Sequence, residues 1–438
     1  MKHTWLVIDS VLDVDSSIIY QSYQKLLIEY MGEEFVDWMS GYQHKDQIKE
    51  IMIKCYVNSI SESSDSIQYI LSSFNFLEKL CFNTYNAFHQ IDDSDVKIKL
   101  TPNMLSKLTT LEVGFCPDHP NNILQMFSNI PTIKKLLTWY MTIFPKKVKW
   151  QLEELIIPNA DEIDDDNCKK FLESQQFTLK KLSFPGSINF AYFIMQNLSN
   201  LESLTLSIDS YDNLDDKFLI RNSQLKRLNI NIWMDYTGNN VLETVLNHYN
   251  NIQFLSIRSS NESRTLDYKQ LINIKLKNLS HLLLKGIKAF PFLNANIPNI
   301  RVLAIACFYY DEDYDYSELS QESMKNVEKL SLDLKTVKDA IVVLSKCPKL
   351  TELNLKIVEW NAENDSFISS INEMLAITNN MKCLGINKHN LLMQQMSIET
   401  LLDQISNIQI GLKTYDIFNS MLTDEWGLEG VEHIHLCT

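Results

Sequence analysis

Glycine and proline are scarce in this sequence, with ten of each among 438 residues. A β-sandwich needs many tight turns, and tight turns rely heavily on these two residues. The shortage therefore argues against a turn-rich β-sandwich. It also leaves little from which to build a glycine-rich phosphate loop, and no nucleophile elbow, kinase signature or zincin motif is present. We therefore expect no enzymatic activity, no cofactor and no catalytic residue.

Long apolar runs are missing as well. No stretch approaches the roughly 18 to 20 apolar residues of a membrane-spanning helix. Aspartates interrupt the short apolar run of the first residues, MKHTWLVIDSVLDVDSS, which is unlike a signal peptide. The eight cysteines are scattered and contain no CxxC pair, so reduced thiols are expected. These features predict a cytoplasmic or nuclear protein that does not enter a membrane.

Basic residues are fewer than acidic residues in this sequence. The 40 Lys and Arg residues stand against 55 Asp and Glu residues, for a net charge of −15. Proteins that bind nucleic acid normally carry a basic surface, so the balance disfavours nucleic acid as a partner and favours a protein with a basic or mixed surface. The hydrophobic share of 45% excludes wholesale disorder.

A short apolar pattern recurs along nearly the whole chain. In KCPKLTELNLKI (346–357), Leu353 and Leu355 share one face of a strand, and Leu350 precedes it. The same spacing starts at the following residues: Ile48, Leu77, Leu108, Ile133, Leu152, Leu179, Leu201, Leu225, Ile252, Leu279, Ile300, Val327, Leu350, Met381, Ile405 and Val431. The mean spacing is about 25 residues, within the range of leucine-rich repeats. The start at Ile133 fits poorly, because Thr138 takes an apolar place.

The segments between these signatures are amphipathic at helical spacing. TVKDAIVVLSKC (336–347) places Val337, Ala340, Ile341 and Leu344 on one helical face. VLETVLNHYNN and NFAYFIMQNL have the same character. A strand and a returning helix cannot bury their apolar faces alone, so neighbouring units must stack. This predicts an α/β leucine-rich-repeat solenoid, a horseshoe with a parallel concave sheet and outer helices, over residues 45–438 in about sixteen repeats.

The CPKLTELNL form, the irregular period and the helical return segments resemble the intracellular, ribonuclease-inhibitor-like leucine-rich repeats. Within that group they look most like the repeat domain of F-box/leucine-rich-repeat proteins. The resemblance implies a protein-binding scaffold whose concave face holds a partner, with the role of substrate receptor in a Skp1–cullin ubiquitin ligase as one form. The alternative is a structural interaction subunit of a stable complex with no ubiquitin-ligase role.

The N-terminal segment departs from that resemblance. Residues 1–44 contain no proline, so the Leu-Pro start of an F-box is missing, and no F-box is recognisable. SSIIYQSYQKLLIEYMGEEFVDWM (16–39) reads as one helix that begins at Ser16 or Ser17, with Leu26 and Leu27 on its apolar side. We expect residues 1–44 to form a helical cap on the first repeat, with a degenerate F-box that reaches Skp1 and cullin as the alternative.

The concave face is the expected binding surface. Its exposed positions are the third, fifth and seventh residues counted from each first leucine. Three neighbouring repeats place five candidate partner-binding residues there: Arg227, Phe254, Arg258, His281 and Lys285. The cations predict affinity for an acidic peptide, with Phe254 as an apolar anchor. The alternative is a solvated sheet face balanced by nearby acids.

Other groups of residues are further candidates for a binding or metal site. Val302, Ala304 and Ala306 form an apolar exposed rung, and Leu137, Trp139 and Ile156 form either a second apolar patch or, for Trp139, part of the core. The acidic runs 161–167 and 309–318 lack the glycine and terminal glutamate of a calcium loop, so we expect solvated loops, with docking on a basic partner as an alternative for the second. His433 and His435 share a strand face, but Cys437 is too far along the strand to join them easily, and no metal is expected.

Overall fold

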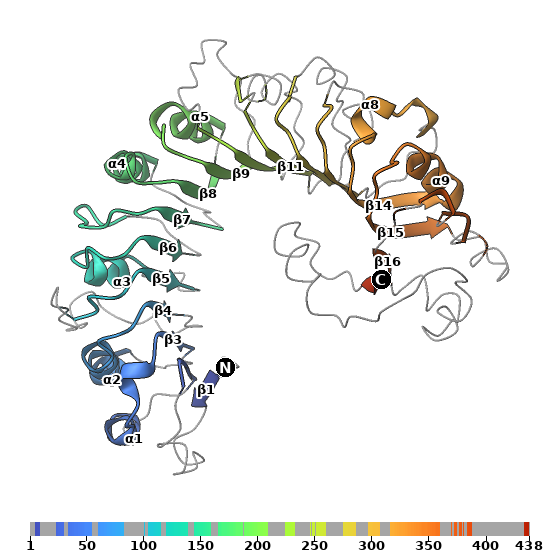
Figure 1. The fold of residues 1–438 in the computed structure, drawn as a ribbon. Helices are drawn as coiled ribbons and strands as arrows, with labels where there is room; N and C mark the ends of the chain where they lie inside the picture. Colours follow the sequence, from blue (N-terminus) through green and yellow to red (C-terminus); the bar gives the residue numbers. More distant parts are fainter. Residues whose placement is uncertain are drawn as a thin grey trace. The chain divides into compact units, whose positions relative to one another are not determined.

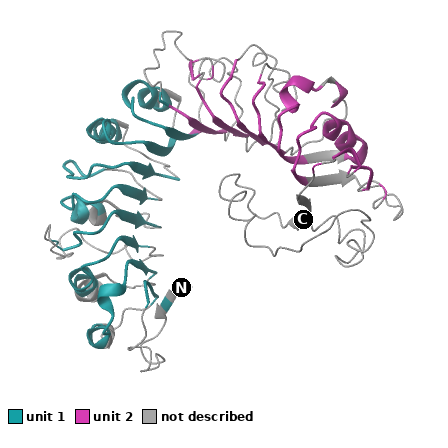
Figure 2. Ribbon diagram, viewed as in Figure 1, with its two compact units in different colours: residues 1–206, 218–224 teal, residues 207–217, 225–438 magenta. Residues whose placement is uncertain are grey.

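The computed structural model describes two long stretches of repeats with gaps. The described residues are 5–8, 23–29, 34–54, 60–82, 100, 104–114, 120–138, 144–158, 165–186, 188–208, 224–232, 246, 248–249, 251–259, 275–285, 297–306, 316–359, 369, 372–374, 376–378, 380, 383–387 and 433–437. The chain divides into two compact units (Figure 2). Unit 1 comprises residues 1–206 and 218–224, and unit 2 comprises residues 207–217 and 225–438.

Unit 1 is a parallel sheet with helices along one side (Figure 1). Its strands are β1 (Trp5–Ile8), β2 (Lys25–Ile28), β3 (Glu50–Ile53), β4 (Lys79–Phe82), β5 (Thr110–Val113), β6 (Lys135–Thr138), β7 (Glu154–Ile156) and β8 (Lys181–Gly186), followed by the start of β9 (Ser203–Ile208). Its helices are α1 (Glu34–Gly41), η2 (Lys45–Gln47), α2 (Ile60–Ser73), α3 (Pro120–Phe127), α4 (Asp165–Gln175) and α5 (Ile188–Asn197).

Unit 2 repeats the arrangement. Its strands are β10 (Arg227–Ile232), β11 (Phe254–Ser259), β12 (His281–Lys285), β13 (Val302–Ala306), β14 (Lys329–Thr336), β15 (Glu352–Glu359), β16 (Cys383–Asn387) and β17 (His433–Cys437). Its described helices are η4 (Tyr316–Glu318), α8 (Gln321–Met324) and α9 (Val337–Ser345). Strands β10 to β16 are parallel, whereas β17 runs antiparallel to β16. In both units, the inner face is the side of the sheet that turns away from these helices.

The leucines of the repeat form the core. In unit 2, Leu228 pairs with Leu255, and Leu255 pairs with Leu282. All three are buried, and the first leucines of the repeats, such as Leu279, are buried beside them. Each strand thus turns the repeated apolar residues of the signature toward the core and the residues between them toward the inner face, as strand geometry requires. The predicted fold, a parallel α/β leucine-rich-repeat solenoid, is confirmed.

The helical return segments form where the apolar spacing predicted them. Helix α9 begins after Thr336, whose hydroxyl accepts from the Asp339 backbone N–H while the Asp339 carboxylate accepts from the Thr336 backbone N–H. This capping box satisfies backbone donors that the first turn leaves free. Ala340 and Leu344 are buried, and α9 contacts β14. Most of the predicted helix at 241–251 lies outside the described residues.

Asparagine side chains link the turns that precede neighbouring strands. Asn326 stands directly before the first apolar residue of its repeat, and its Nδ2 donates to the Pro298 carbonyl of the preceding turn at 2.8 Å. Asn299 makes the equivalent bond to the Lys277 carbonyl at 2.6 Å. This role was not predicted, although an asparagine stands in the same place in several of the repeat signatures.

The N-terminal helix prediction is wrong over Lys25–Ile28. These residues form strand β2, in which Leu26 and Ile28 are fully buried and which pairs with β3. Within the described part of residues 16–39, the helix is the one that begins at Glu34, α1. Two adjacent leucines suit either a helix or a half-buried strand, and pairing with a neighbouring strand decides the outcome here. The predicted domain boundary between residues 44 and 45 stays a prediction. Strand β2, before this boundary, pairs with β3, after it.

Two other expectations about the repeats have clear outcomes. The signature at Val431 was expected to add a parallel rung, but the chain returns to β16 in the opposite direction as β17. The signature at Ile405 lies outside the described residues. The register at Ile133 is confirmed: Leu136 and Thr138 of β6 are both fully buried. Among the described residues, no helix is long and apolar enough to cross a bilayer.

We expect Leu255→Asp to destabilise the protein by several kcal/mol, because it places an unpaired carboxylate between Leu228 and Leu282. Thermal unfolding measures the effect. Gln253→Asp, at an exposed position on the same rung, is the matched control and should change little. A melting curve unchanged by Leu255→Asp would contradict the stacked core.

Thr138→Val should raise the free energy of unfolding by about 1 kcal/mol. Thr138 is fully buried, and its Oγ1 has no hydrogen-bond partner among the described residues. Valine has nearly the same shape and lacks this buried hydroxyl group. Thr110→Val, at a half-buried inner-face position of β5, is the control and should have little effect in the same denaturant titration. A lower stability of the Thr138→Val variant would contradict this prediction, because it would show that the Thr138 hydroxyl makes a stabilising hydrogen bond.

Candidate functional site

The predicted partner-binding residues occupy two rows on the inner face of unit 2. Arg227, Phe254 and His281 pair across β10, β11 and β12 as a first row. Arg258 and Lys285 pair in a parallel row four residues further along the strands. The register predicted for these residues is therefore correct. The rows lie roughly 13 Å apart, so the cations form two groups and not one cluster.

The first row is a stack of three side chains. The Arg227 guanidinium carbon lies 4.3 Å from the centroid of the Phe254 ring. On the other side, the His281 ring is stacked at 6.0 Å between centroids, and its Nδ1 lies 2.8 Å from the Ser280 hydroxyl. Cation–aromatic attraction of this kind holds the guanidinium against the face of the ring. The stack therefore restrains Arg227 beside the Phe254 ring.

Phe254 is not the exposed anchor that was expected. Its exposed fraction is only 6%, because its neighbours in the row lie against both sides of the ring. The middle row of the inner face is also buried: Ser256 is 1% exposed and Leu283 is 4% exposed. Ser256 Oγ has no hydrogen-bond partner within the described part of the chain.

The apolar rung on β13 was likewise expected to be exposed, and this expectation is wrong for two of its residues. Val302 and Ala304 pack with Leu283 in one buried cluster. The side chain of Ala306 is outside the described part of the chain. Side chains on adjacent parallel strands stand about 4.8 Å apart, so an apolar row covers much of its own surface.

Charge distinguishes the inner faces of the two units. In unit 1, lysines and glutamates alternate across the strands: Glu50 pairs with Lys25 at 2.7 Å and with Lys79 at 3.2 Å, and Lys79 also pairs with Glu112 at 3.0 Å. In unit 2, the sequences of β10 to β13 (RLNINI, FLSIRS, HLLLK and VLAIA) contain no Asp or Glu. We call the inner face of β10 to β13 the acid-free window. Acids return on β14 and β15, where Lys329 pairs with Glu352 at 3.0 Å.

The remaining candidates have partial outcomes. Leu137 and Ile156 are half-buried neighbours on β6 and β7, and Trp139 lies outside the described residues. Of the run 309–318, the described part forms η4, whose Tyr316 carbonyl accepts from Lys346 Nζ at 3.3 Å. Of the run 161–167, the last three residues begin α4.

Neither histidines nor cysteines supply a described reactive centre. Strand β17 carries His433, His435 and Cys437, but their side chains are outside the described set. Where side chains are described, no three His, Cys, Asp or Glu residues gather as metal ligands. Burial raises the pKa of the Cys347 thiol to about 12, and burial with the nearby Glu112 carboxylate raises that of Cys81 to about 12. Both stay protonated at neutral pH and are poor nucleophiles.

Comparison with known proteins finds distant structural similarity alone. No protein-family model matches the sequence, and none of the curated proteins matches it. Among solved structures, CroV588, a circular leucine-rich-repeat protein, is 14% identical with a TM-score of 0.37; the match covers 81% of this chain and 50% of CroV588. The chain therefore spans about half the length of that protein.

Two bacterial leucine-rich-repeat proteins are also similar. LegL7 of Legionella pneumophila is 11% identical over 82% of this chain and 92% of its own, with a TM-score of 0.29. A Leptospira interrogans protein is 14% identical over 81% of this chain and 89% of its own, with a TM-score of 0.30. At this distance the similarities carry no information on a ligand.

Glu50 should make stability depend on pH. Burial alone would raise its pKa, but hydrogen bonds and charge from Lys25 and Lys79 outweigh burial and hold the pKa below its ordinary value. A carboxylate with a lowered folded pKa stabilises the fold fully above its ordinary value of about 4.3, and this contribution is lost as pH falls through the lowered value. We expect Glu50→Gln to cost about 1 kcal/mol or less at pH 7 and less still in acid.

Thermal unfolding of wild type and Glu50→Gln at pH 7, 5 and 3 measures this dependence. The more exposed Glu78 forms an ion pair with Lys49 at 2.8 Å, so Glu78→Gln serves as the control with little effect. A difference between wild type and Glu50→Gln that grows toward low pH would contradict the assignment.

Proposed function

We propose that this chain is a protein-binding leucine-rich-repeat scaffold, and that the acid-free window of unit 2 holds an acidic segment of the partner. The observation that carries the proposal is the contrast between the inner faces. Lys25, Lys79 and Glu50 neutralise one another on unit 1. By contrast, the strands that carry Arg227 and Arg258 bring no acid of their own.

The two rows of the window suit different parts of an acidic ligand. The Arg227 guanidinium, oriented by Phe254, favours planar two-point contact with a carboxylate. Arg258 and Lys285, about 13 Å away, would attract a second acidic side chain of an extended segment. In this proposal Phe254 orients the cation, and its buried ring is not itself inserted into the partner.

The choice between ligase receptor and structural subunit depends on the N-terminus. A receptor that recruits Skp1 and a cullin needs a three-helix F-box. The described parts of residues 1–44 are two strands and one helix, with β2 built into the repeat sheet. This favours a structural interaction subunit of a stable complex over the ubiquitin-ligase role.

Free thiols at Cys81, Cys168 and Cys347 support a reducing location, cytoplasmic or nuclear.

The triple variant Arg227→Glu, Arg258→Glu, Lys285→Glu tests the window. We expect it to fold, with some loss of stability from the broken Arg227–Phe254 contact, and to lose its main co-purifying protein. Quantitative affinity purification with mass spectrometry measures retention, and thermal unfolding checks the fold. The matched control reverses three exposed lysines elsewhere in unit 2: Lys275, Lys277 and Lys338.

Retention of the same partners by the triple variant would show that the window is only a solvated face. Equal loss in the control variant would assign the effect to net charge. The same experiment on the wild type separates the two roles: recovery of Skp1 with a cullin would favour the ligase receptor, and recovery of a stable partner without them would favour the structural subunit.

A further inference from the structure

The spacing of the cationic rows on the acid-free window restricts which ligands can reach both of them. Along β11, Phe254, Ser256 and Arg258 lie on the inner face, because the side chains of a strand alternate between its two faces. Each residue of a parallel strand advances the chain by about 3.3 Å, so Ser256 lies about 6.6 Å from the first row and from the row of Arg258 and Lys285. We call the row of Arg258 and Lys285 the third row.

The middle row between them carries no charge. It consists of Asn229, Ser256, Leu283 and Ala304, which pair in register across β10 to β13. The last three of these side chains are almost completely buried. An acidic side chain of a ligand placed over this row would lose water without a cation in direct contact, which costs free energy. A small or apolar uncharged side chain suits this position better.

The direction of a bound segment decides how many cations it meets. A segment that crosses the strands along the first row passes from Arg227 to the Phe254 and His281 rings, about 4.8 Å apart from strand to strand. A segment that crosses along the third row meets Arg258 and Lys285, which are direct neighbours. A segment that runs along the strands reaches cations of both rows, so the charge distribution favours this direction.

We propose that the segment held by the acid-free window is extended, runs along the strands, and carries two acidic residues four positions apart with a small or apolar uncharged residue midway. This inference rests on the proposed function and names the class of segment that the window selects. Four residues of an extended chain span about 13 Å, and alternate side chains point to the same side. Positions i, i+2 and i+4 of the segment therefore meet the first, middle and third rows in turn.

The two acidic positions meet different cations. Arg227 is restrained against the Phe254 ring, and its guanidinium can bond both oxygens of one carboxylate. Arg258 and Lys285 are paired in register on β11 and β12, so both can attract the second carboxylate. Each row thus contributes one charged contact, and the distance between the rows selects the spacing of the acids.

Surface plasmon resonance of the full chain over immobilised peptides at low salt tests the proposal. The test peptide contains Glu-Thr-Ala-Thr-Glu, and its isomer contains Thr-Glu-Ala-Glu-Thr, with the same flanking glycines. Threonine spacers favour an extended backbone over a helix, in which residues four apart would lie much closer together. We expect the test peptide to bind about fivefold more tightly, because the isomer cannot place a carboxylate at each row.

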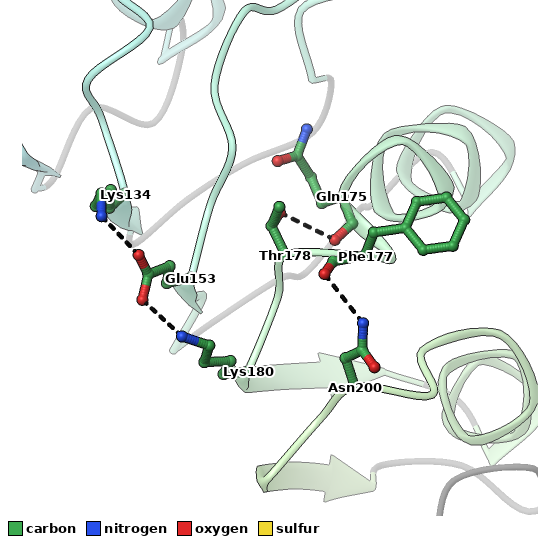
Figure 3. Close-up of polar contacts among 7 residues, drawn as sticks. All are labelled: Lys134, Glu153, Gln175, Phe177, Thr178, Lys180 and Asn200. Atoms are coloured by element: carbon green, nitrogen blue, oxygen red, sulfur yellow. Dashed lines mark hydrogen bonds and ion pairs between the residues drawn. The ribbon is translucent and has the colours of Figure 1, made fainter.

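Two double variants locate this preference. Arg258→Gln with Lys285→Gln removes the cations of the third row and should reduce the preference for the test peptide to less than about twofold. The matched control, Lys134→Gln with Lys180→Gln, removes two exposed cations of unit 1 that share Glu153 at 2.8 and 3.0 Å (Figure 3). It changes the net charge equally and should keep the full preference. Thermal unfolding of each variant checks the fold.

Equal binding of the two peptides, tighter binding of the isomer, or no binding of either would overturn the proposed spacing. A preference that survives the loss of Arg258 and Lys285, or that is lost in the control variant, would also overturn it, because recognition would then not depend on the third row. The proposed function fails by a different result, which is retention of the partner by the triple charge-reversal variant. The two failures are therefore distinguishable.

Discussion

The stacking of apolar rungs is the interaction on which the rest of the structure depends. A single repeat has one strand and one return segment and cannot bury its leucines alone. Leu255 is fully buried because Leu228 and Leu282 flank it in the same register. Parallel pairing satisfies the strand backbone in the same contact. Since the repeated leucines, such as Leu228, Leu255 and Leu282, fill the core, the residues between them lie on the inner face and determine its chemistry.

The residues on the inner face differ in charge between the two units. On its inner face unit 1 has a ladder of ion pairs centred on Glu50 and Lys79, in which lysines and glutamates neutralise one another. The sequences of β10 to β13 in unit 2 contain Arg and Lys but no Asp or Glu, and the Phe254 ring is buried against Arg227. Exposed ion pairs contribute little stability, so the contrast matters more for recognition than for folding.

Features that depend on the spacing of residues within a repeat could be predicted from the sequence. Features that depend on side chains or strands of neighbouring repeats could not. The spacing of Leu228, Leu255 and Leu282 was enough to predict the strands, which of their residues lie on each face, and the register between them. The burial of Phe254 was not predictable from its own repeat, because it arises from Arg227 and His281 on the adjacent strands. The direction of β17 is equally non-local, since it depends on how the chain returns to β16.

The central claim, that an acidic segment of a partner lies on the acid-free window, is tested most directly by hydrogen–deuterium exchange of the chain with and without its main co-purifying protein. The account predicts that the partner slows amide exchange in peptides that cover β10, β11 and β12, with the inner-face strands of unit 1 unchanged. Slower exchange confined to unit 1, or to unit 2 outside β10 to β13, would contradict it.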